Sequence, residues 1–183
     1  MASRYNSPMP EPARIVVLLP TWVGDVVMAT PTLRALRETF PDAHVTLFGS
    51  RTALAVLEGS PWFDAVTTKP SPRRRIGPDL LDTIGRLRSG RHDLALLLPN
   101  SFRSALLTRL AGIPRRAGYA RDGRGWLLTD AVQPPRDIEG ESEVIPTIDY
   151  YAALVRRLGA APVDRRMELT VLPKDAAAAD GLL

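Results

Sequence analysis

Hydrophobic positions along this chain fall into short continuous blocks that alternate with segments of helical spacing. Residues 14–19, RIVVLL, are almost uniformly apolar and rich in β-branched side chains, which is typical of a strand buried on both faces of a parallel sheet. From Asp25 to Phe40 the apolar residues recur at helical spacing. The same alternation predicts strands at residues 14–19, 43–49, 64–69, 92–99 and 115–120, and helices at residues 25–39, 51–60, 79–90, 101–112 and 145–160.

This alternation predicts an α/β fold: a doubly wound, mostly parallel, Rossmann-like sheet with helices on both faces. Residues 121–143 form a long polar segment without a regular hydrophobic pattern. In such sheets ligands gather beyond the carboxyl ends of the strands. The loops PTWVGD, PSPRRR and PNSFRS each follow a predicted strand, so we expect all three at one edge of the sheet, the binding face.

The pattern divides the chain into three parts. Residues 1–13 are proline-rich and lack an apolar signal-peptide core, which predicts a disordered leader. Residues 14–160 carry the strand–helix alternation and form one predicted domain. Residues 161–183 resemble the approach to a further helix, so we expect them to begin a linker.

The loop PTWVGD admits two interpretations of its acid. Gly24 allows a tight turn and close approach of a ligand to the backbone. Asp25 either caps the following helix, which the pattern alone favours, or acts on a substrate. Pro31 either opens the long helix, with Thr30 as its cap, or kinks it. Trp22 either covers the sheet edge or stacks on a substrate ring.

Two further loops and one turn carry candidate binding groups. Asn100 and Ser101 either cap the next helix or join Arg103 in binding hydroxyls or an anion beside a helix N-terminus. The arginines at 73–75 either form a solvated loop or meet phosphates. GRGW, with Arg124, is basic and forms a predicted turn. Neither the dinucleotide fingerprint nor the P-loop pattern is present in the sequence.

Composition narrows the function further. The absence of cysteine excludes a disulfide scaffold and thiolate metal sites, and the two histidines are too few for a His-rich zinc site. A net charge of +4 favours anionic partners. Aromatic residues make up only 6% and no nucleic-acid motif is present, which disfavours nucleic acid as a partner. No apolar run is long enough to span a membrane, so the expected location is the cytoplasm.

Taken together, three segments resemble a known family. They are LLPTWVGDVVMATPTLRALRETFPDAHVTLF, LLPNSFRSALLTRLAGIPRRAGY continued by GRGWLLTDAV, and PTIDYYAALVRRLG. They are similar to glycosyltransferase family nine, the ADP-heptose:lipopolysaccharide heptosyltransferases, and in particular to its heptosyltransferase II branch. The resemblance extends from about Arg14 to Leu172, and its core is G-D-x-V-x-x-x-P with N-S-F-R-S in register.

The resemblance implies a GT-B fold, in which two Rossmann-like domains face each other across a cleft. The N-terminal domain would bind a phosphorylated lipid A–Kdo–heptose acceptor, and the C-terminal domain the ADP-heptose donor. Transfer would invert the anomeric centre without a metal or cofactor, on the cytoplasmic side of the inner membrane and with peripheral membrane contact. Asp25 would be the general base, and the acceptor would be bound by Thr21, Trp22, Gly24, Asn100, Ser101, Arg103, Arg73, Arg74 and Arg124.

The chain departs from this family in length, because a complete member has a second domain of similar size. We therefore expect the 183-residue chain by itself to bind the acceptor weakly and to transfer nothing. Two alternatives remain open at this point: a family member with a different sugar or acceptor, and a non-catalytic Rossmann-like module for a phosphorylated ligand. Replacing Asp25 with alanine separates catalysis from capping.

Overall fold

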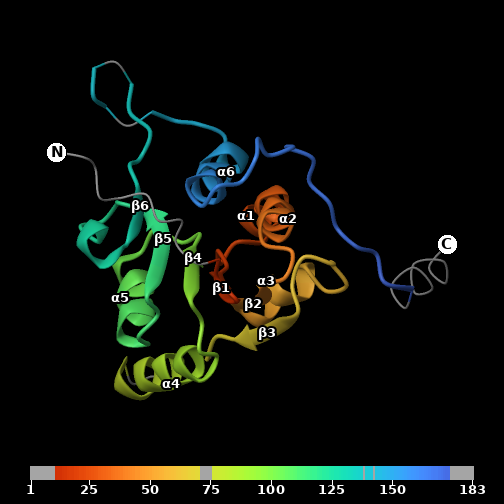
Figure 1. Ribbon diagram of the computed structural model, residues 1–183, viewed down its shortest axis with the longest axis vertical. Coiled ribbons are helices and arrows are strands. Elements are labelled where there is room, and N and C mark those ends of the chain that lie inside the picture. The colour runs from red at the N-terminus through yellow and green to blue at the C-terminus, as the bar shows by residue number, and fades with distance from the viewer. Residues whose placement is uncertain (1–10, 71–75, 138, 142, 174–183) are drawn as a thin grey trace.

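Six parallel strands form a single sheet in a computed structural model of the chain, which describes residues 11–70, 76–137, 139–141 and 143–173 (Figure 1). The spatial order is β3-β2-β1-β4-β5-β6, and every neighbouring pair is parallel. The strands are β1 (Arg14–Leu18), β2 (His44–Gly49), β3 (Ala65–Thr68), β4 (Leu94–Leu97), β5 (Arg115–Tyr119) and β6 (Asp130–Val132). The predicted doubly wound parallel sheet is confirmed.

Helices cover both faces of the sheet. They are α1 (Val23–Met28), α2 (Thr30–Thr39), α3 (Arg51–Val56), α4 (Ile76–Ser89), α5 (Phe102–Leu110) and α6 (Thr147–Arg157), with a 3-10 turn η1 at Gly125–Leu127. Alternate residues of β1 serve the two faces. Ile15 and Val17 pack in the cluster that holds α2, α3 and α6, whereas Val16 and Leu18 pack in the cluster that holds α4 and α5.

The predicted helix over residues 25–39 is two helices. Ala29 ends α1 and precedes α2, and Pro31 lies in the first turn of α2, where its missing N–H removes no helical hydrogen bond. Thr30 is the first residue of α2 rather than its cap, and its hydroxyl donates to the Val27 carbonyl at 2.8 Å. The segment that carries Asp25 is therefore separate from the main helix.

The sequence did not predict β6, which lies inside the polar stretch 121–143. A strand of three residues is too short to show a period. Asp130 is buried at its start and pairs with Arg115 of the neighbouring strand at 3.3 Å. β6 therefore owes its place to pairing with β5 rather than to an apolar pattern.

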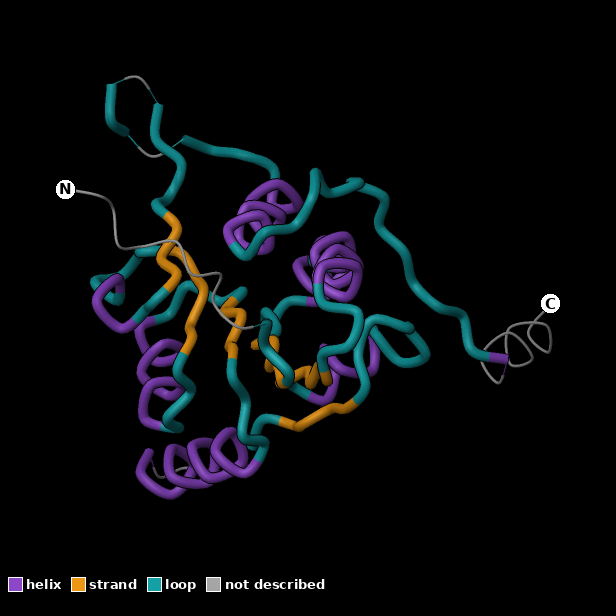
Figure 2. Tube along the Cα trace, in the orientation of Figure 1, coloured by secondary structure: helices purple, strands orange, loops and turns teal. Residues whose placement is uncertain are grey.

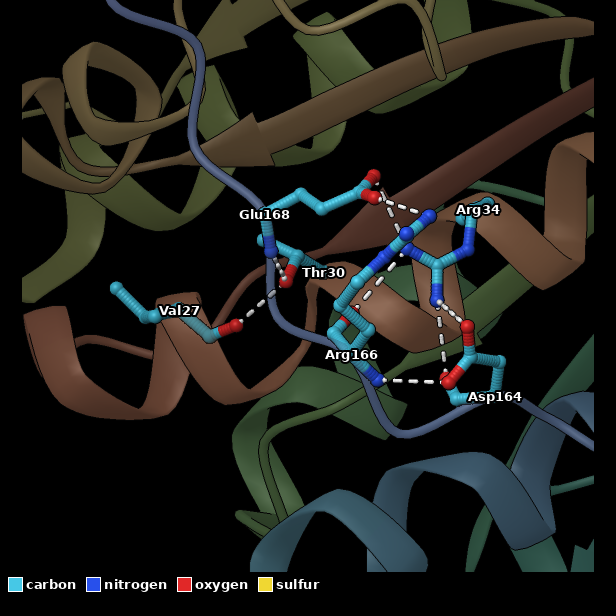
Figure 3. A network of polar contacts seen from close by, with 6 residues as sticks. All are labelled: Val27, Thr30, Arg34, Asp164, Arg166 and Glu168. Atoms are coloured by element: carbon cyan, nitrogen blue, oxygen red, sulfur yellow. Dashed lines mark hydrogen bonds and ion pairs between the residues drawn. The ribbon is translucent and has the colours of Figure 1, made fainter.

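The chain that follows α6 runs back along the helix layer. We call residues 161–172 the strap; Figure 2 shows it as a long loop after α6. Arg34 of α2 donates to the carbonyls of Asp164 at 3.0 Å and Arg166 at 3.2 Å. It also forms an ion pair with Glu168 at 3.0 Å (Figure 3). These contacts fasten the strap to the side of α2.

The strap also reaches the corner between α1 and α2. The amide of Glu168 donates to the Thr30 hydroxyl at 3.2 Å, the same hydroxyl that donates to Val27 (Figure 3). Residues 1–10 of the expected leader and 174–183 of the expected linker lie outside the described residues. Within the described part of the chain, no helix has the length and apolarity needed to cross a bilayer.

Candidate functional site

The strand order reverses direction between β1 and β4, which lie side by side at the centre of the sheet. Beyond Leu18 the chain enters α1 on one face, and beyond Leu97 it enters α5 on the other. The two connections therefore diverge and leave an opening at the carboxyl edge, which is the usual ligand position in such sheets. The structure brings PTWVGD and PNSFRS together at this edge, as the sequence predicted.

One opening at this edge is a cleft of about 350 Å³ that we call the Asp25 cleft. The loops after β1, β4 and β5 and the start of α6 contribute its walls. Acidic, basic and phenolic groups all face it; the lining residues are Asp25, Asn100, Arg121, Glu143, Val144, Ile145, Thr147, Tyr150 and Tyr151.

Asp25 is half-buried in the first turn of α1, and its carboxylate accepts no hydrogen bond from the residues that the structure describes. Trp22 holds the N-cap position, and no side chain in the described part of the chain caps the helix. The interpretation of Asp25 as a capping residue is therefore wrong. Burial, followed by the nearby Asp25 charge and by Tyr150, raises the pKa of the Tyr151 phenol, so the carboxylate lies close to a phenol that stays protonated.

Arg124 lies behind the cleft and is fully buried. Its guanidinium donates to the carbonyls of Tyr119 at 2.9 Å and Ser101 at 3.1 Å, and to the Ser104 hydroxyl at 2.9 Å. It also donates to the carbonyl of Pro99 and to the side-chain oxygen of Asn100, the latter at 3.3 Å. The expectation that Arg124 binds acceptor phosphate is therefore corrected, because its donors are used inside the protein and no part of it reaches solvent.

A second pocket of about 150 Å³ opens on the other side of the β1 loop, over the carboxyl ends of β1, β2 and β4. Its walls are mostly apolar, and Lys69 and Arg103 are the cations among its lining residues. The pocket is lined by Leu18, Leu19, Pro20, Thr21, Phe48, Gly49, Ser50, Lys69, Pro99, Ser101, Arg103, Ser104 and Leu107. Thr21, Ser101 and Arg103 thus meet here, apart from Asp25.

The remaining candidate residues lie in different structural environments. Ser101 caps α5, since its hydroxyl accepts from the Ser104 amide at 3.3 Å. Trp22 is 77% exposed and does not cover the sheet edge. A side chain at Gly24 would meet open space, so room for a ligand against this backbone is available. Arg73 and Arg74 lie outside the described residues.

Several groups at the edge were not predicted from the sequence. Lys69 directly follows β3, and the rule that ligands gather at carboxyl ends applied to strand 64–69 identifies it. Tyr150 and Tyr151 belong to the apolar pattern of the last predicted helix, which gives no sign of a site. Only the tertiary structure brings them to the cleft. Tyr150 stacks on Tyr119 with ring centroids 3.7 Å apart, and the Tyr119 hydroxyl donates to the Tyr150 carbonyl at 2.7 Å.

Comparison with known proteins shows which family this chain resembles. The sequence profile described as Glycosyltransferase family 9 (heptosyltransferase) matches residues 81–170. Lipopolysaccharide heptosyltransferase 2 of Salmonella typhimurium is 33% identical over an alignment of 126 residues, and the match covers 64% of this chain and 34% of that protein. Its Escherichia coli counterpart is 33% identical over 125 residues, with the same coverage.

Solved structures agree. The structure of E. coli ADP-heptose lps heptosyltransferase II superimposes with a TM-score of 0.69 at 27% identity and covers 92% of this chain and 50% of that one. A glycosyltransferase family 9 structure from Veillonella parvula reaches a TM-score of 0.76 at 21% identity, which shows the fold. The chain thus spans a third to a half of the length of these relatives. The resemblance to the heptosyltransferase family is confirmed in sequence and in fold.

Proposed function

We propose that this chain, similar to glycosyltransferase family 9 in motif, sequence and fold, forms the acceptor-binding part of an inverting heptosyltransferase. The transfer would run from ADP-heptose to the lipopolysaccharide inner core. One observation carries the proposal: a half-buried carboxylate, Asp25, stands without a hydrogen-bond partner among the described residues and faces a cleft at the point where the strand order reverses.

In the proposed reaction, the Asp25 carboxylate takes the proton from an acceptor hydroxyl as that oxygen attacks the anomeric carbon of the heptose. The bond from that carbon to the ADP oxygen breaks on the opposite face, and its electron pair leaves with ADP. General-base assistance of this kind contributes about 10²–10⁴-fold to the rate. A carboxylate not engaged by neighbouring donors is free to receive the proton, which is what the structure of α1 supports.

Binding would supply the rest by alignment. Asn100 shares the Asp25 cleft and offers a polar contact to a sugar hydroxyl, and Gly24 and Trp22 lie open beside it. Lys69 and Arg103 would contact an acceptor phosphate at the second pocket, which Thr21 and Ser101 also line. Arg73 and Arg74, which follow β3 in the sequence and lie outside the described residues, remain proposed phosphate contacts.

The ADP-heptose donor would bind to a region equivalent to the part of the relatives that this chain does not span.

A lipid-linked acceptor would place the reaction in the cytoplasm at the inner face of the inner membrane. Peripheral contact there is supported by aromatic side chains on or next to the carboxyl edge, since Trp22 is 77%, Trp126 69% and Phe102 40% exposed. Co-sedimentation with anionic vesicles, lost in W126A, tests that contact.

The main experiment joins this chain to the remainder of E. coli heptosyltransferase 2, replacing the segment that it matches. The chimera should release ADP in the presence of ADP-heptose and a delipidated, phosphorylated inner-core oligosaccharide. D25A should abolish that release and leave oligosaccharide affinity within about twofold. If D25A transfers heptose at the parent rate, Asp25 is not the base. If the oligosaccharide does not bind the parent chain, a non-catalytic module for another phosphorylated ligand becomes the better account.

A further inference from the structure

We propose that Arg124 is a positioning residue that acts through Asn100, and that the Asp25 cleft consequently recognises a pair of neighbouring sugar hydroxyls. This inference deepens the proposed function and rests on it for the identity of the ligand. The orientation of Asn100 itself rests on geometry alone.

The first step is that the Arg124 guanidinium fixes the loop after β4 by donating to backbone and side-chain oxygens of that loop. Its donors meet the carbonyls of Pro99 and Ser101 and the hydroxyl of Ser104, so both ends of the PNS stretch are tied to one buried group. Gly118 leaves space for the guanidinium, because a Cβ there would lie 3.3 Å from its Nη2 atom. No ion pair to Arg124 is found in the described part of the chain, so carbonyl and hydroxyl oxygens solvate its charge.

The second step is that Arg124 fixes which way the Asn100 amide points. An arginine donates and never accepts, so the Asn100 atom 3.3 Å from its Nη2 must be the oxygen. The Tyr150 hydroxyl donates to the same oxygen at 3.2 Å. Tyr150 is itself held by its stack on Tyr119 and by the hydrogen bond from the Tyr119 hydroxyl. Both lone pairs of the Asn100 oxygen are therefore used.

The third step is that only N–H groups of Asn100 remain to serve the cleft. They donate to no residue within the described ranges, and Asn100 is half-buried in the wall that also holds Asp25. An ionised carboxylate accepts only, and this oriented amide nitrogen donates only. Besides Arg121 and Glu143, the cleft thus carries an obligate acceptor in Asp25 and an obligate donor in the Asn100 amide nitrogen.

Such a pair matches two adjacent hydroxyls of a sugar. One hydroxyl donates its proton to Asp25 and is the one that attacks. The oxygen of its neighbour accepts from Asn100 and fixes the ring so that the first hydroxyl points at the base. The acceptor class is then a sugar with a free hydroxyl next to the reacting one, and a site that relies on a hydrogen bond strongly rejects analogues that lack the partner.

The test uses the full 183-residue chain, ¹⁵N-labelled. Asn100→Asp identifies the Asn100 side-chain NH₂ signals and replaces donors with an acceptor of the same shape. Arg124→Lys removes the planar fork, which a lysine cannot reproduce. Arg116→Lys is the matched control, since Arg116 is the other buried arginine among the described residues and donates to the carbonyls of Leu127, Ile113 and Pro114, away from Asn100.

In R124K the Asn100 NH₂ signals should shift or broaden, and in R116K they should stay in place. Affinity for the delipidated, phosphorylated inner-core oligosaccharide should fall about tenfold in both N100D and R124K and less than twofold in R116K. Unchanged Asn100 signals in R124K overturn the proposal, and so does an equal loss of affinity in R116K. If the oligosaccharide fails to bind the parent chain, the proposed function fails, while the NH₂ signals still decide the role of Arg124.

Discussion

Asp25→Ala should leave the stability of this chain almost unchanged, although the side chain lies in the first turn of a helix. A helix cap loses about 0.5–2 kcal/mol when it is replaced by alanine. Asp25 makes no such hydrogen bond within the described ranges, so the change removes only its interaction with the helix dipole, about 0.3–1 kcal/mol. Alanine has the higher helix propensity, which returns about 0.5 kcal/mol. The net change should lie within about 0.5 kcal/mol of zero.

Ser50, at the same edge of the sheet, provides a capping residue with which the stability change in D25A can be compared. Its hydroxyl caps α3 by accepting from the Ala53 amide at 3.1 Å. S50A should therefore cost about 1 kcal/mol. Urea unfolding followed by circular dichroism measures both variants, with an unchanged m-value confirming that the same transition is compared.

A loss in D25A equal to that in S50A would refute the argument, because it would mean that the carboxylate stabilises the helix in solution. Unchanged stability in D25A would instead mean that the carboxylate does not stabilise the helix. A charged side chain kept half-buried without a stabilising contact is one whose position serves something other than folding, and loss of transfer in the D25A chimera would identify that as chemistry.

Three further predictions concern other parts of the molecule. Burial and the neighbouring charges of Arg14 and His44 lower the pKa of His92 to about 4, against an ordinary 6.5. The unfolded chain therefore takes up the proton first, and stability that is complete above pH 6.5 should fall by about 3 kcal/mol towards pH 4, a slope that His92→Gln removes in urea titrations. Replacing Arg34 with Met should speed amide exchange at residues 164–168 by hydrogen–deuterium exchange, and R37M should not, since Arg37 pairs with Asp64 instead. Mutating Gly118 to Ala should lower the melting temperature, because the added methyl group presses on the Arg124 guanidinium; an unaltered melting curve would contradict this contact.

Most of the fold followed from the sequence because its local signals agree. Continuous apolar runs gave the central strands, and glycine or proline marked nearly every helix end. The pattern over residues 25–39 was compatible with one helix or two, because periodicity does not register a single-residue break such as Ala29. β6 carries too few residues for a period and exists only through its neighbour.

The candidate site was predictable only in part. The rule that ligands lie beyond carboxyl ends located Asp25 and Asn100 correctly at one edge. The destination of Arg124 was not predictable, because an arginine in a polar turn normally points to solvent. Left-handed backbone at Asp122 (φ 51°) and Gly123 (φ 69°) turns the chain back towards the sheet, and only tertiary structure supplies the ring of oxygens that receives the side chain.

The Thr30 hydroxyl has a mechanical consequence. It joins the carbonyl of Val27 in the helix that holds Asp25 to the amide of Glu168 in the strap. Tension or slack in the strap would therefore be transmitted through one oxygen atom to the helix that carries the carboxylate. A force on residues 161–172 would therefore displace the carboxylate that we propose as the general base, without any contact with the cleft.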